Sequence, residues 1–158
     1  VKFKHIDLSS LTIFDDVVEN SNKTIDEKDL LEIGRKGEEL VYKYLKDIHR
    51  QNENVSIKWL NETVETGSPY DIEINFTDAT LNTHRIEVKT TTKHVDNYQF
   101  SISIQEIDEI LKFPDAYYIY RVNLKNHSLI ILDNIKLNLS NKQQLELKMN
   151  VLTTNDSN

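Results

Sequence analysis

Residues 69–92 read PYDIEINFTDATLNTHRIEVKTTT, and this stretch decides the fold. Apolar and polar side chains alternate along 70–76 and again along 84–89, which is the period of half-buried β-strands. The segment between the two runs is short and polar, as a tight connection requires. The stretch therefore predicts a β-hairpin, although one of its two faces is unusually rich in charge.

Three charged side chains of this hairpin are expected to meet on that face. Glu87 and Lys89 lie two residues apart on one strand, so they point the same way. In an antiparallel hairpin centred near Ala79, Asp71 pairs with about residue 87. Directly opposed carboxylates repel each other unless a cation binds between them. Oxygen ligands of this kind suit Mg²⁺ or Mn²⁺, so the hairpin predicts a divalent-metal site.

Such a site suits phosphodiester hydrolysis, because a divalent metal neutralises charge on the scissile phosphate and lowers the pKa of a bound water. Lys89 would orient or help to deprotonate that water and would stabilise the developing negative charge. Thr90 and Thr91 follow the lysine, and their hydroxyls either bind a phosphate or reflect the β-propensity of threonine. The plainer alternative for the whole face is an exposed sheet surface with a cross-strand ion pair.

Upstream of the hairpin, apolar residues recur at helical spacing from Leu30 to about Arg50. Gly34 and Gly37 weaken this helix by roughly 1 kcal/mol each relative to alanine, so we expect close approach of the helix to a neighbouring strand. Residues 1–29 look like an N-terminal arm or a linker from an upstream domain, with a short helix inside 7–20.

Downstream, Ser103 and Glu106 have the spacing of a capping box and predict a helix that starts near Ile104 and ends before Pro114. The pattern fades beyond Lys136, which leaves 30–136 as the compact domain and 137–158 as a C-terminal extension and flexible tail. These elements predict an α/β fold with a central mixed β-sheet flanked by helices. Further strands are expected at 55–60, 98–103, 116–124 and 129–134.

Composition narrows the class of protein. The chain has 158 residues, which suits about one domain, and no apolar run approaches the ~18 residues of a membrane helix. The chain contains no cysteine, which excludes disulfides and thiolate metal sites and favours a cytoplasmic location. The formal charge of −7 argues against a protein that coats nucleic acid indiscriminately. We therefore expect a fused or associated recognition or motor domain to supply substrate affinity.

The chain resembles a known family in several blocks that keep their order and spacing. The hairpin matches the D…(D/E)xK signature of the restriction-endonuclease-like PD-(D/E)xK superfamily. The wider set is similar to the C-terminal domain family named after the plant protein NO VEIN. The blocks are GRKGEELVYKYL, Trp59 and Asn61, GSPYDI, IEVKTT, FSIS followed by Glu106, and YYIYRV.

This resemblance implies a restriction-endonuclease-like core and a set of site residues. Asp71, Glu87 and Lys89 take the signature positions, although Tyr70 separates Pro69 from the aspartate. Glu38 matches the helix carboxylate that many superfamily members aim at the metal. Helical periodicity alone does not decide between Glu38 and Glu39.

The sequence therefore predicts a Mg²⁺- or Mn²⁺-dependent endonuclease domain that acts on DNA, as the cleavage module of a larger restriction or defence protein. The defence role rests on analogy with the superfamily. The alternative is a catalytically latent nuclease fold that binds nucleic acid or a partner protein. The sequence indicates neither the choice between DNA and RNA nor the oligomeric state.

Overall fold

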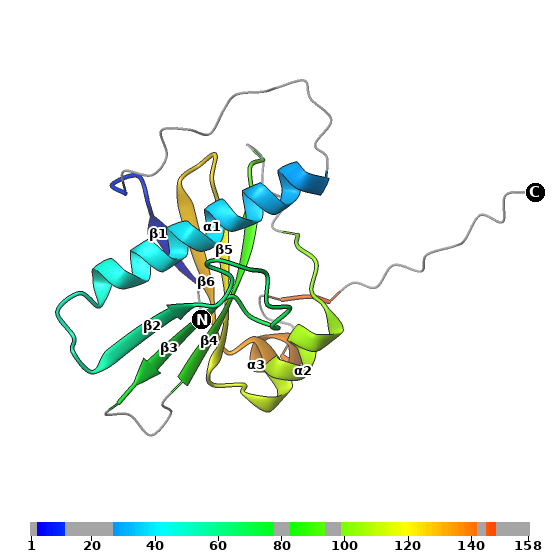
Figure 1. Cartoon of the computed structure of the whole chain (residues 1–158). Coiled ribbons are helices and arrows are strands. Elements are labelled where there is room, and N and C mark those ends of the chain that lie inside the picture. Colours follow the sequence, from blue (N-terminus) through cyan, green and yellow to red (C-terminus); the bar gives the residue numbers. More distant parts are fainter. Residues whose placement is uncertain (1–2, 12–26, 78–82, 94–98, 142–144, 148–158) are drawn as a thin grey trace, which may run out of the picture.

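The computed structural model describes residues 3–11, 27–77, 83–93, 99–141 and 145–147. Their elements follow the chain in a β-α-β-β-β-α-β-β-α order (Figure 1). The strands are β1 (Lys4–Asp7), β2 (Val55–Trp59), β3 (Ile72–Phe76), β4 (Thr83–Thr91), β5 (Tyr117–Asn123) and β6 (Ser128–Leu132). The helices are α1 (Glu27–Ile48), α2 (Ile104–Lys112) and α3 (Ile135–Ser140).

The six strands form one mixed sheet in the order β1-β6-β5-β4-β3-β2. All neighbouring pairs are antiparallel except β4 and β5, which run parallel and are joined through α2. The predicted hairpin is confirmed: β3 pairs with β4 in the register Ile72↔Ile86, which places Asp71 next to Glu87. The α/β class and the mixed sheet flanked by helices are confirmed as well, and they are consistent with a restriction-endonuclease-like core.

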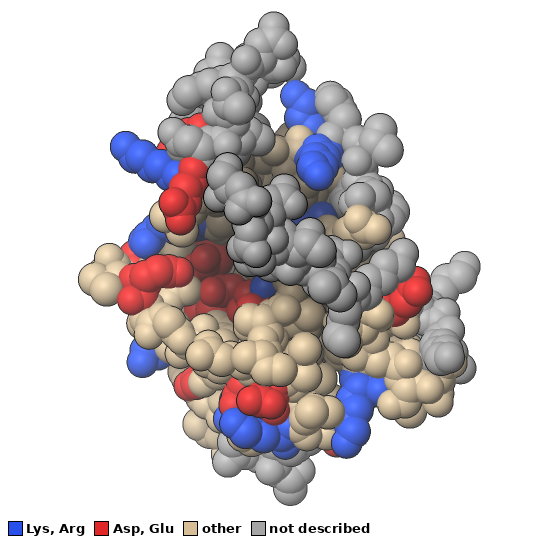
Figure 2. All heavy atoms as spheres, turned by 90° about the vertical axis from the view of Figure 1, so that its right-hand side faces the viewer, with Lys and Arg blue, Asp and Glu red and all other residues tan. Residues whose placement is uncertain are grey.

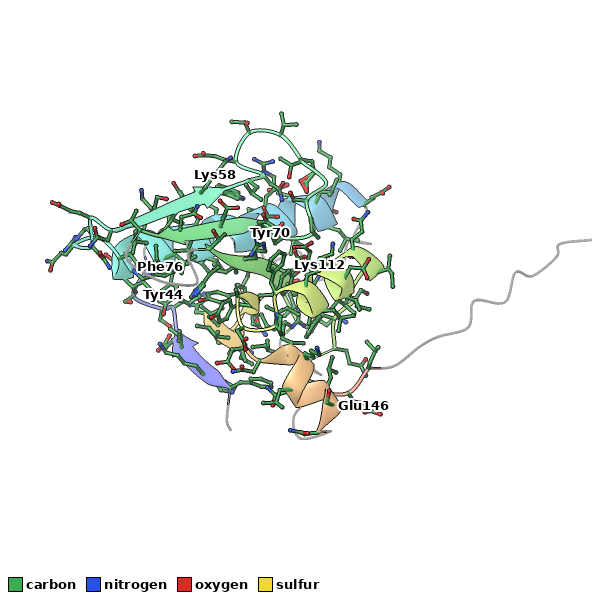
Figure 3. All side chains as sticks on the ribbon, turned by 90° about the horizontal axis from the view of Figure 1, so that it is seen from below. Tyr44, Lys58, Tyr70, Phe76, Lys112 and Glu146 are labelled. Carbon is green, nitrogen blue, oxygen red and sulfur yellow. The ribbon has the colours of Figure 1, made fainter. Side chains whose placement is uncertain are left out.

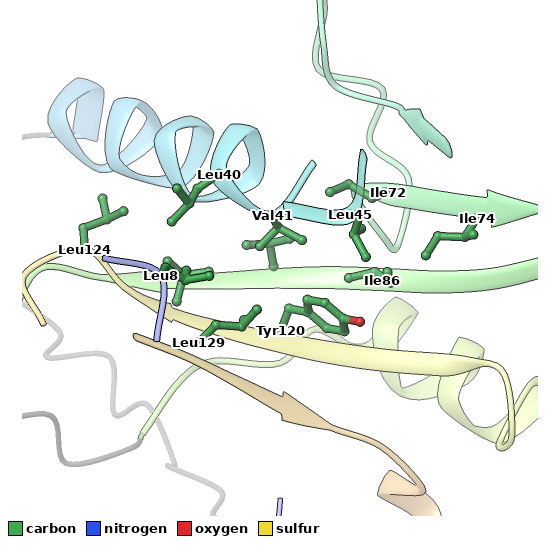
Figure 4. Close-up of a cluster of buried hydrophobic side chains, with 12 residues drawn as sticks. Leu8, Leu40, Val41, Leu45, Ile72, Ile74, Ile86, Tyr120, Leu124 and Leu129 are labelled. Carbon is green, nitrogen blue, oxygen red and sulfur yellow. The ribbon is translucent and has the colours of Figure 1, made fainter. Parts of the chain in front are cut away.

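Each face of the sheet carries its own core. On one face, Leu40, Val41 and Leu45 of α1 pack on Ile72 and Ile86 (Figure 4). On the other face, Ile110 of α2 and Ile135 of α3 pack on Tyr117 and Ile119 of β5. The carboxylates of the hairpin therefore lie at a sheet whose two sides are both covered. No described helix is both long and apolar enough to cross a membrane.

One of the two helix glycines has the expected role. A Cβ added at Gly37 would lie 1.9 Å from Thr90 Oγ1, so α1 approaches β4 more closely there than any side chain would permit. The same explanation is wrong for Gly34, where an added Cβ would meet nothing within 4 Å. Close approach to the central strand at Gly37 holds the following residue, Glu38, against the sheet.

Three expectations need correction. Lys4–Asp7 pairs with β6 and Leu8 is buried, so part of the N-terminal arm completes the sheet. The described part of the expected strand at 98–103 is irregular and pairs with no strand of the sheet, and its last residue, Ser103, is the N-cap of α2. The helix α3 crosses the expected boundary at Lys136. The short helix predicted inside 7–20 falls mostly outside the described residues.

Candidate active site

The candidate site lies where β3 begins beside the middle of β4. Asp71 immediately precedes β3, and its Oδ2 accepts a hydrogen bond of 2.8 Å from the Val88 backbone N–H. Its own N–H donates to the Ile86 carbonyl at 2.9 Å. These two bonds fix the aspartate against β4 on either side of Glu87. The predicted juxtaposition of the two carboxylates on neighbouring strands is therefore observed.

Lys89 is held between two carboxylates. Its Nζ donates to Glu87 Oε1 at 2.8 Å and to Glu106 Oε1 at 2.9 Å. The three side chains are buried, with 17% of Lys89 and 11% of each glutamate exposed. The capping box is confirmed too, since Glu106 Oε2 accepts from Ser103 N and Ser103 Oγ accepts from Glu106 N. Glu106 thus caps α2 as expected, and it also binds Lys89, which the sequence had not indicated.

The helix contributes Glu38 rather than Glu39. Glu38 is 8% exposed, and its Oε2 accepts a hydrogen bond of 2.8 Å from Trp59 Nε1. Glu39 points outward, with 41% of its side chain exposed, and pairs with Lys43 one helical turn later. The structure therefore resolves the choice that periodicity left open. It also gives Trp59 a polar role beside the site, in addition to its packing against Tyr42.

Asn61 connects the helix carboxylate to the hairpin carboxylate, and sequence reasoning assigned it no role. Its Nδ2 donates to Asp71 Oδ1 at 2.9 Å and lies 3.4 Å from Glu38 Oε2. Its Oδ1 accepts from the N–H and hydroxyl of Thr66, so the amide is oriented by its own loop. The only sequence signal was its place in the family resemblance, because an asparagine in a polar loop has no distinctive pattern.

The electrostatics of the cluster show an excess of negative charge. Burial and then the charge of Glu38 raise the pKa of Asp71 to about 7. Burial and then the charge of Asp71 raise the pKa of Glu87 to about 9. Burial also raises the pKa of Glu38, against the hydrogen bonds from Trp59 and Asn61. The raised pKa values indicate that the positive charge of Lys89 does not fully offset the burial and mutual repulsion of these carboxyl groups.

The pKa of Lys89 is raised as well, but for a lysine a raised pKa favours the charged form. Burial alone lowers the pKa of Lys89, but the neighbouring carboxylates of Glu87 and Glu106 more than compensate, so the pKa is raised overall. A lysine with a raised pKa stays an ammonium at neutral pH, which suits it to stabilise negative charge.

The donor set fits a hard divalent cation. Asp71 and Glu87 offer carboxylate oxygens, and Mg²⁺ characteristically takes one or two of these while it keeps several waters. A cation there would also supply the positive charge that the raised pKa values indicate is missing. Within the described ranges, no three histidine, aspartate or glutamate side chains are already grouped as a metal site. The fit therefore rests on the hairpin pair, with Glu38 as the nearby third carboxylate.

The two threonines differ in their position. Thr90 lies on the α1 side of β4, where its Oγ1 is covered by Gly37 and has no hydrogen-bond partner among the described atoms. A covered hydroxyl of this kind cannot reach a phosphate without movement of the helix, which argues against the expected substrate contact. Thr91 shares the face of Lys89 and accepts a bond from Lys93 N at 3.3 Å, so its role as a substrate ligand stays a prediction.

Acidic side chains gather on one face of the molecule, with basic groups beside them (Figure 2). Figure 3 views the molecule from below and labels Tyr70, the residue before Asp71, and Lys112, the last residue of α2. Arg85 bridges these two elements, since it lies 5.8 Å from the Tyr70 ring and 3.6 Å from Glu109 of α2. The loop before β3 and the helix after β4 therefore frame the carboxylates.

Comparison with known proteins places most of this framework in one family. A family model described as the C-terminal region of protein NO VEIN matches residues 37–131, which include Glu38, Asp71, Glu87 and Lys89. The chain is 31% identical over 127 residues to the protein NO VEIN-LIKE of Arabidopsis thaliana. It is 30% identical over 128 residues to the protein NO VEIN of the same plant. No solved structure matches the chain.

The relatives are much longer than this chain. The first match covers 80% of the chain but 18% of NO VEIN-LIKE, and the second covers 79% of the chain but 4% of NO VEIN. The similarity therefore describes one domain of each relative. The residues matched by the family model include the second half of α1, the hairpin and the parallel strand β5.

Proposed function

The chain belongs to the protein NO VEIN C-terminal family, and from this premise and the buried carboxylates of its hairpin we propose that it is a divalent-metal-dependent endonuclease domain. Its reaction is the hydrolysis of phosphodiester bonds in DNA. We further propose that the domain is related to the PD-(D/E)xK nucleases, with Asp71, Glu87 and Lys89 as its signature and Glu38 as the helix carboxylate.

One observation carries this proposal. Asp71 and Glu87 are buried side by side at neighbouring strands, each 8% exposed, and both pKa values are raised by burial and by like charge. Two such acids destabilise a fold unless they serve a ligand, because burying charge without compensation is costly. The lysine that completes the set stands 2.8 Å from Glu87. An arrangement built only for stability would place apolar side chains at these positions.

The residues of the site would have three roles: metal binding, orientation of the metal ligands, and stabilisation of charge on the phosphate. Asp71 and Glu87 would hold Mg²⁺ or Mn²⁺, with Glu38 as a third carboxylate. When bound, the metal would offset charge on the phosphate and make a nearby water more acidic. Asn61 and the Val88 N–H keep Asp71 oriented toward the site. Lys89, as an ammonium, would orient the attacking water and stabilise the negative charge that develops at the phosphate.

Substrate recognition is proposed to need more than this domain. The chain carries a formal charge of −7, whereas binding to phosphate backbones depends on basic surface. The relatives place the matching domain within far longer proteins. We propose a fused or associated domain that delivers DNA to the site, in the cytoplasm and in a restriction or defence context.

A second candidate function has one observation in its favour. Lys89 is already engaged by both Glu87 and Glu106, so its ammonium is neutralised by carboxylates. A domain of this kind would keep the nuclease fold, stay latent in cleavage, and bind nucleic acid or a partner protein. The two candidates differ in whether cleavage appears when metal and substrate are present together.

The test is a cleavage assay with purified chain on supercoiled and linear DNA, single-stranded DNA and RNA, each with Mg²⁺, Mn²⁺ or a chelator. We expect cleavage of DNA that needs the metal and disappears in Asp71→Asn, purified in parallel. Equal cleavage by Asp71→Asn would identify a contaminating nuclease. Absence of cleavage by the chain and by its longer parent protein would favour the latent module.

A further inference from the structure

Glu106 uses its two carboxylate oxygens for two different purposes. Oε2 accepts a hydrogen bond of 2.9 Å from Ser103 N and closes the capping box of α2. Oε1 accepts a bond of 2.9 Å from Lys89 Nζ on the neighbouring strand. The first helical turn of α2 is thereby joined directly to the lysine of the candidate site.

The cap by itself does not explain a buried carboxylate here. A capping box needs one acceptor oxygen at this position, and glutamine serves it as well as glutamate. The Glu106 side chain is only 11% exposed, and a buried charge is costly unless a partner compensates it. The second oxygen and the negative charge are therefore accounted for by Lys89 rather than by the helix.

The helix that carries Glu106 is fixed to the sheet. Ile110 is buried in the core beneath α2. Arg85 of β4 lies 3.6 Å from Glu109 and 3.6 Å from the Phe113 ring centroid, which anchors the end of the helix. A rigid support of this kind suits a group that must hold another side chain in place.

We propose that Glu106 is a positioning residue, which holds the Lys89 ammonium at the phosphate-binding side of the site. This inference rests on the proposed nuclease function. Lysine carries its charge on a flexible four-carbon stem, so its direction depends on its partners. Glu87 alone is a weak anchor for a working site, because a cation bound by Glu87 would compete with Lys89 for the same carboxylate. Glu106 would keep its contact with Lys89 whether or not Glu87 binds a cation.

The experiment compares Glu106→Ala with Ser103→Ala in the full chain. Both variants damage the cap, but only Glu106→Ala removes one of the two carboxylates that hold the Lys89 ammonium and leaves Glu87 alone. We expect Glu106→Ala to lower kcat by about tenfold to a hundredfold at nearly constant KM, as misplacement of a catalytic group does. Ser103→Ala should lower the melting temperature and keep kcat within about twofold of wild type, since it leaves the lysine contact intact.

A second variant covers the case in which Glu106→Ala folds poorly. Glu106→Gln keeps the volume of the side chain but offers one acceptor oxygen instead of two and carries no charge. We expect its kcat to fall as well, with Mn²⁺ affinity by calorimetry unchanged. Wild-type kcat in Glu106→Gln would overturn the inference. Weaker Mn²⁺ binding in that variant would make Glu106 a metal ligand, which would also overturn it.

An NMR measurement that does not depend on cleavage tests this inference separately from the proposed function. The NMR signal of a lysine ammonium is visible only while hydrogen bonds slow its exchange with water, and Lys89→Ala identifies it by loss of the signal. We expect the signal in wild type and Ser103→Ala, and its disappearance in Glu106→Ala. If no substrate is cleaved, the nuclease proposal fails, yet this signal still decides whether Glu106 holds Lys89. Persistence of the signal in Glu106→Ala would refute the positioning role.

Discussion

At the scale of single residues, the site depends on how each carboxylate is restrained. Asp71 is fixed by a backbone N–H of β4 and by Asn61, whereas Glu38 is fixed by Trp59. Neutral donors orient these acids without cancelling their charge. The remaining negative charge would attract a metal. These hydrogen bonds would therefore orient the carboxylates for a cation without supplying the positive charge of that cation.

Lys89→Ala tests catalysis apart from binding. The charge that Lys89 would stabilise exists mainly in the transition state, so we expect cleavage to fall by about a hundredfold or more. Metal affinity should survive, and nucleic-acid affinity should decrease only by the share of one phosphate contact. Rates come from single-turnover cleavage, with the exposed Lys58→Ala as control. A loss of affinity with no loss of rate at saturating DNA would contradict the catalytic role.

Glu38→Gln and Glu39→Gln form a matched pair on one helix. Glu38 is buried beside Asp71, so its neutralisation should weaken Mn²⁺ binding several-fold by removing charge from the site. Glu39 is exposed and paired with Lys43, so its neutralisation should cost at most about 0.5 kcal/mol of stability and leave metal binding unchanged. Calorimetry with Mn²⁺ measures both. Equal affinities in the two variants would remove Glu38 from the proposed metal site.

At the scale of elements, local pattern predicted most of the framework. The alternation in 70–76 and 84–89 gave the hairpin and its register, and the capping box gave the start of α2. The strand β1 was missed because four residues with mixed polarity are recognisable only by their partner, β6. The contact of Glu106 with Lys89 was missed for a similar reason, since it joins two residues that are 17 positions apart in sequence and lie on different elements. Pairings between distant segments depend on tertiary packing, which local periodicity does not encode.

The close packing of α1 on β4 gives a prediction at the same scale. Gly37→Ala would place a Cβ inside the Thr90 side chain, so we expect a loss of about 1–3 kcal/mol as overpacking typically costs. Gly34→Ala meets open space in the same helix and should stabilise the protein by up to about 1 kcal/mol. Urea unfolding of the two variants measures the difference. Equal stabilities would show that the helix can move away from the strand without cost.

At the scale of the whole molecule, the charge distribution separates catalysis from recognition. The buried acids Glu38, Asp71 and Glu87 lie on α1, immediately before β3 and on β4, and the chain as a whole is acidic too. Local metal binding is compatible with this balance, whereas an acidic chain is not suited to coat nucleic acid indiscriminately. The domain is therefore expected to act on DNA that another part of a larger assembly presents to it.

The raised pKa values of the site carboxyl groups make the stability of the whole protein depend on pH. Because the pKa of Asp71 is about 7 in the folded protein and 3.8 in the reference state, folding binds a proton between these values. The metal-free protein should therefore lose stability as pH rises from about 4 to 7, and Glu87 acts in the same direction. His84, whose pKa burial lowers, acts in the opposite direction near its ordinary value. Asp71→Asn keeps His84 and removes the share of the aspartate together with the part of the Glu87 shift that the charge of Asp71 causes.

We expect the melting temperature of wild type, measured without metal, to fall more steeply between pH 5 and 7 than that of Asp71→Asn. Mg²⁺ should reverse this difference, because ionised Asp71 and Glu87 bind it and protons compete with it. At a concentration about a hundredfold above its Kd, a ligand stabilises the folded state by about 2.7 kcal/mol. That gain should be present at pH 8, small at pH 5, and strongly reduced in Asp71→Asn. Parallel melting curves for the two proteins, with and without Mg²⁺, would mean that Asp71 neither holds an extra proton nor binds the metal.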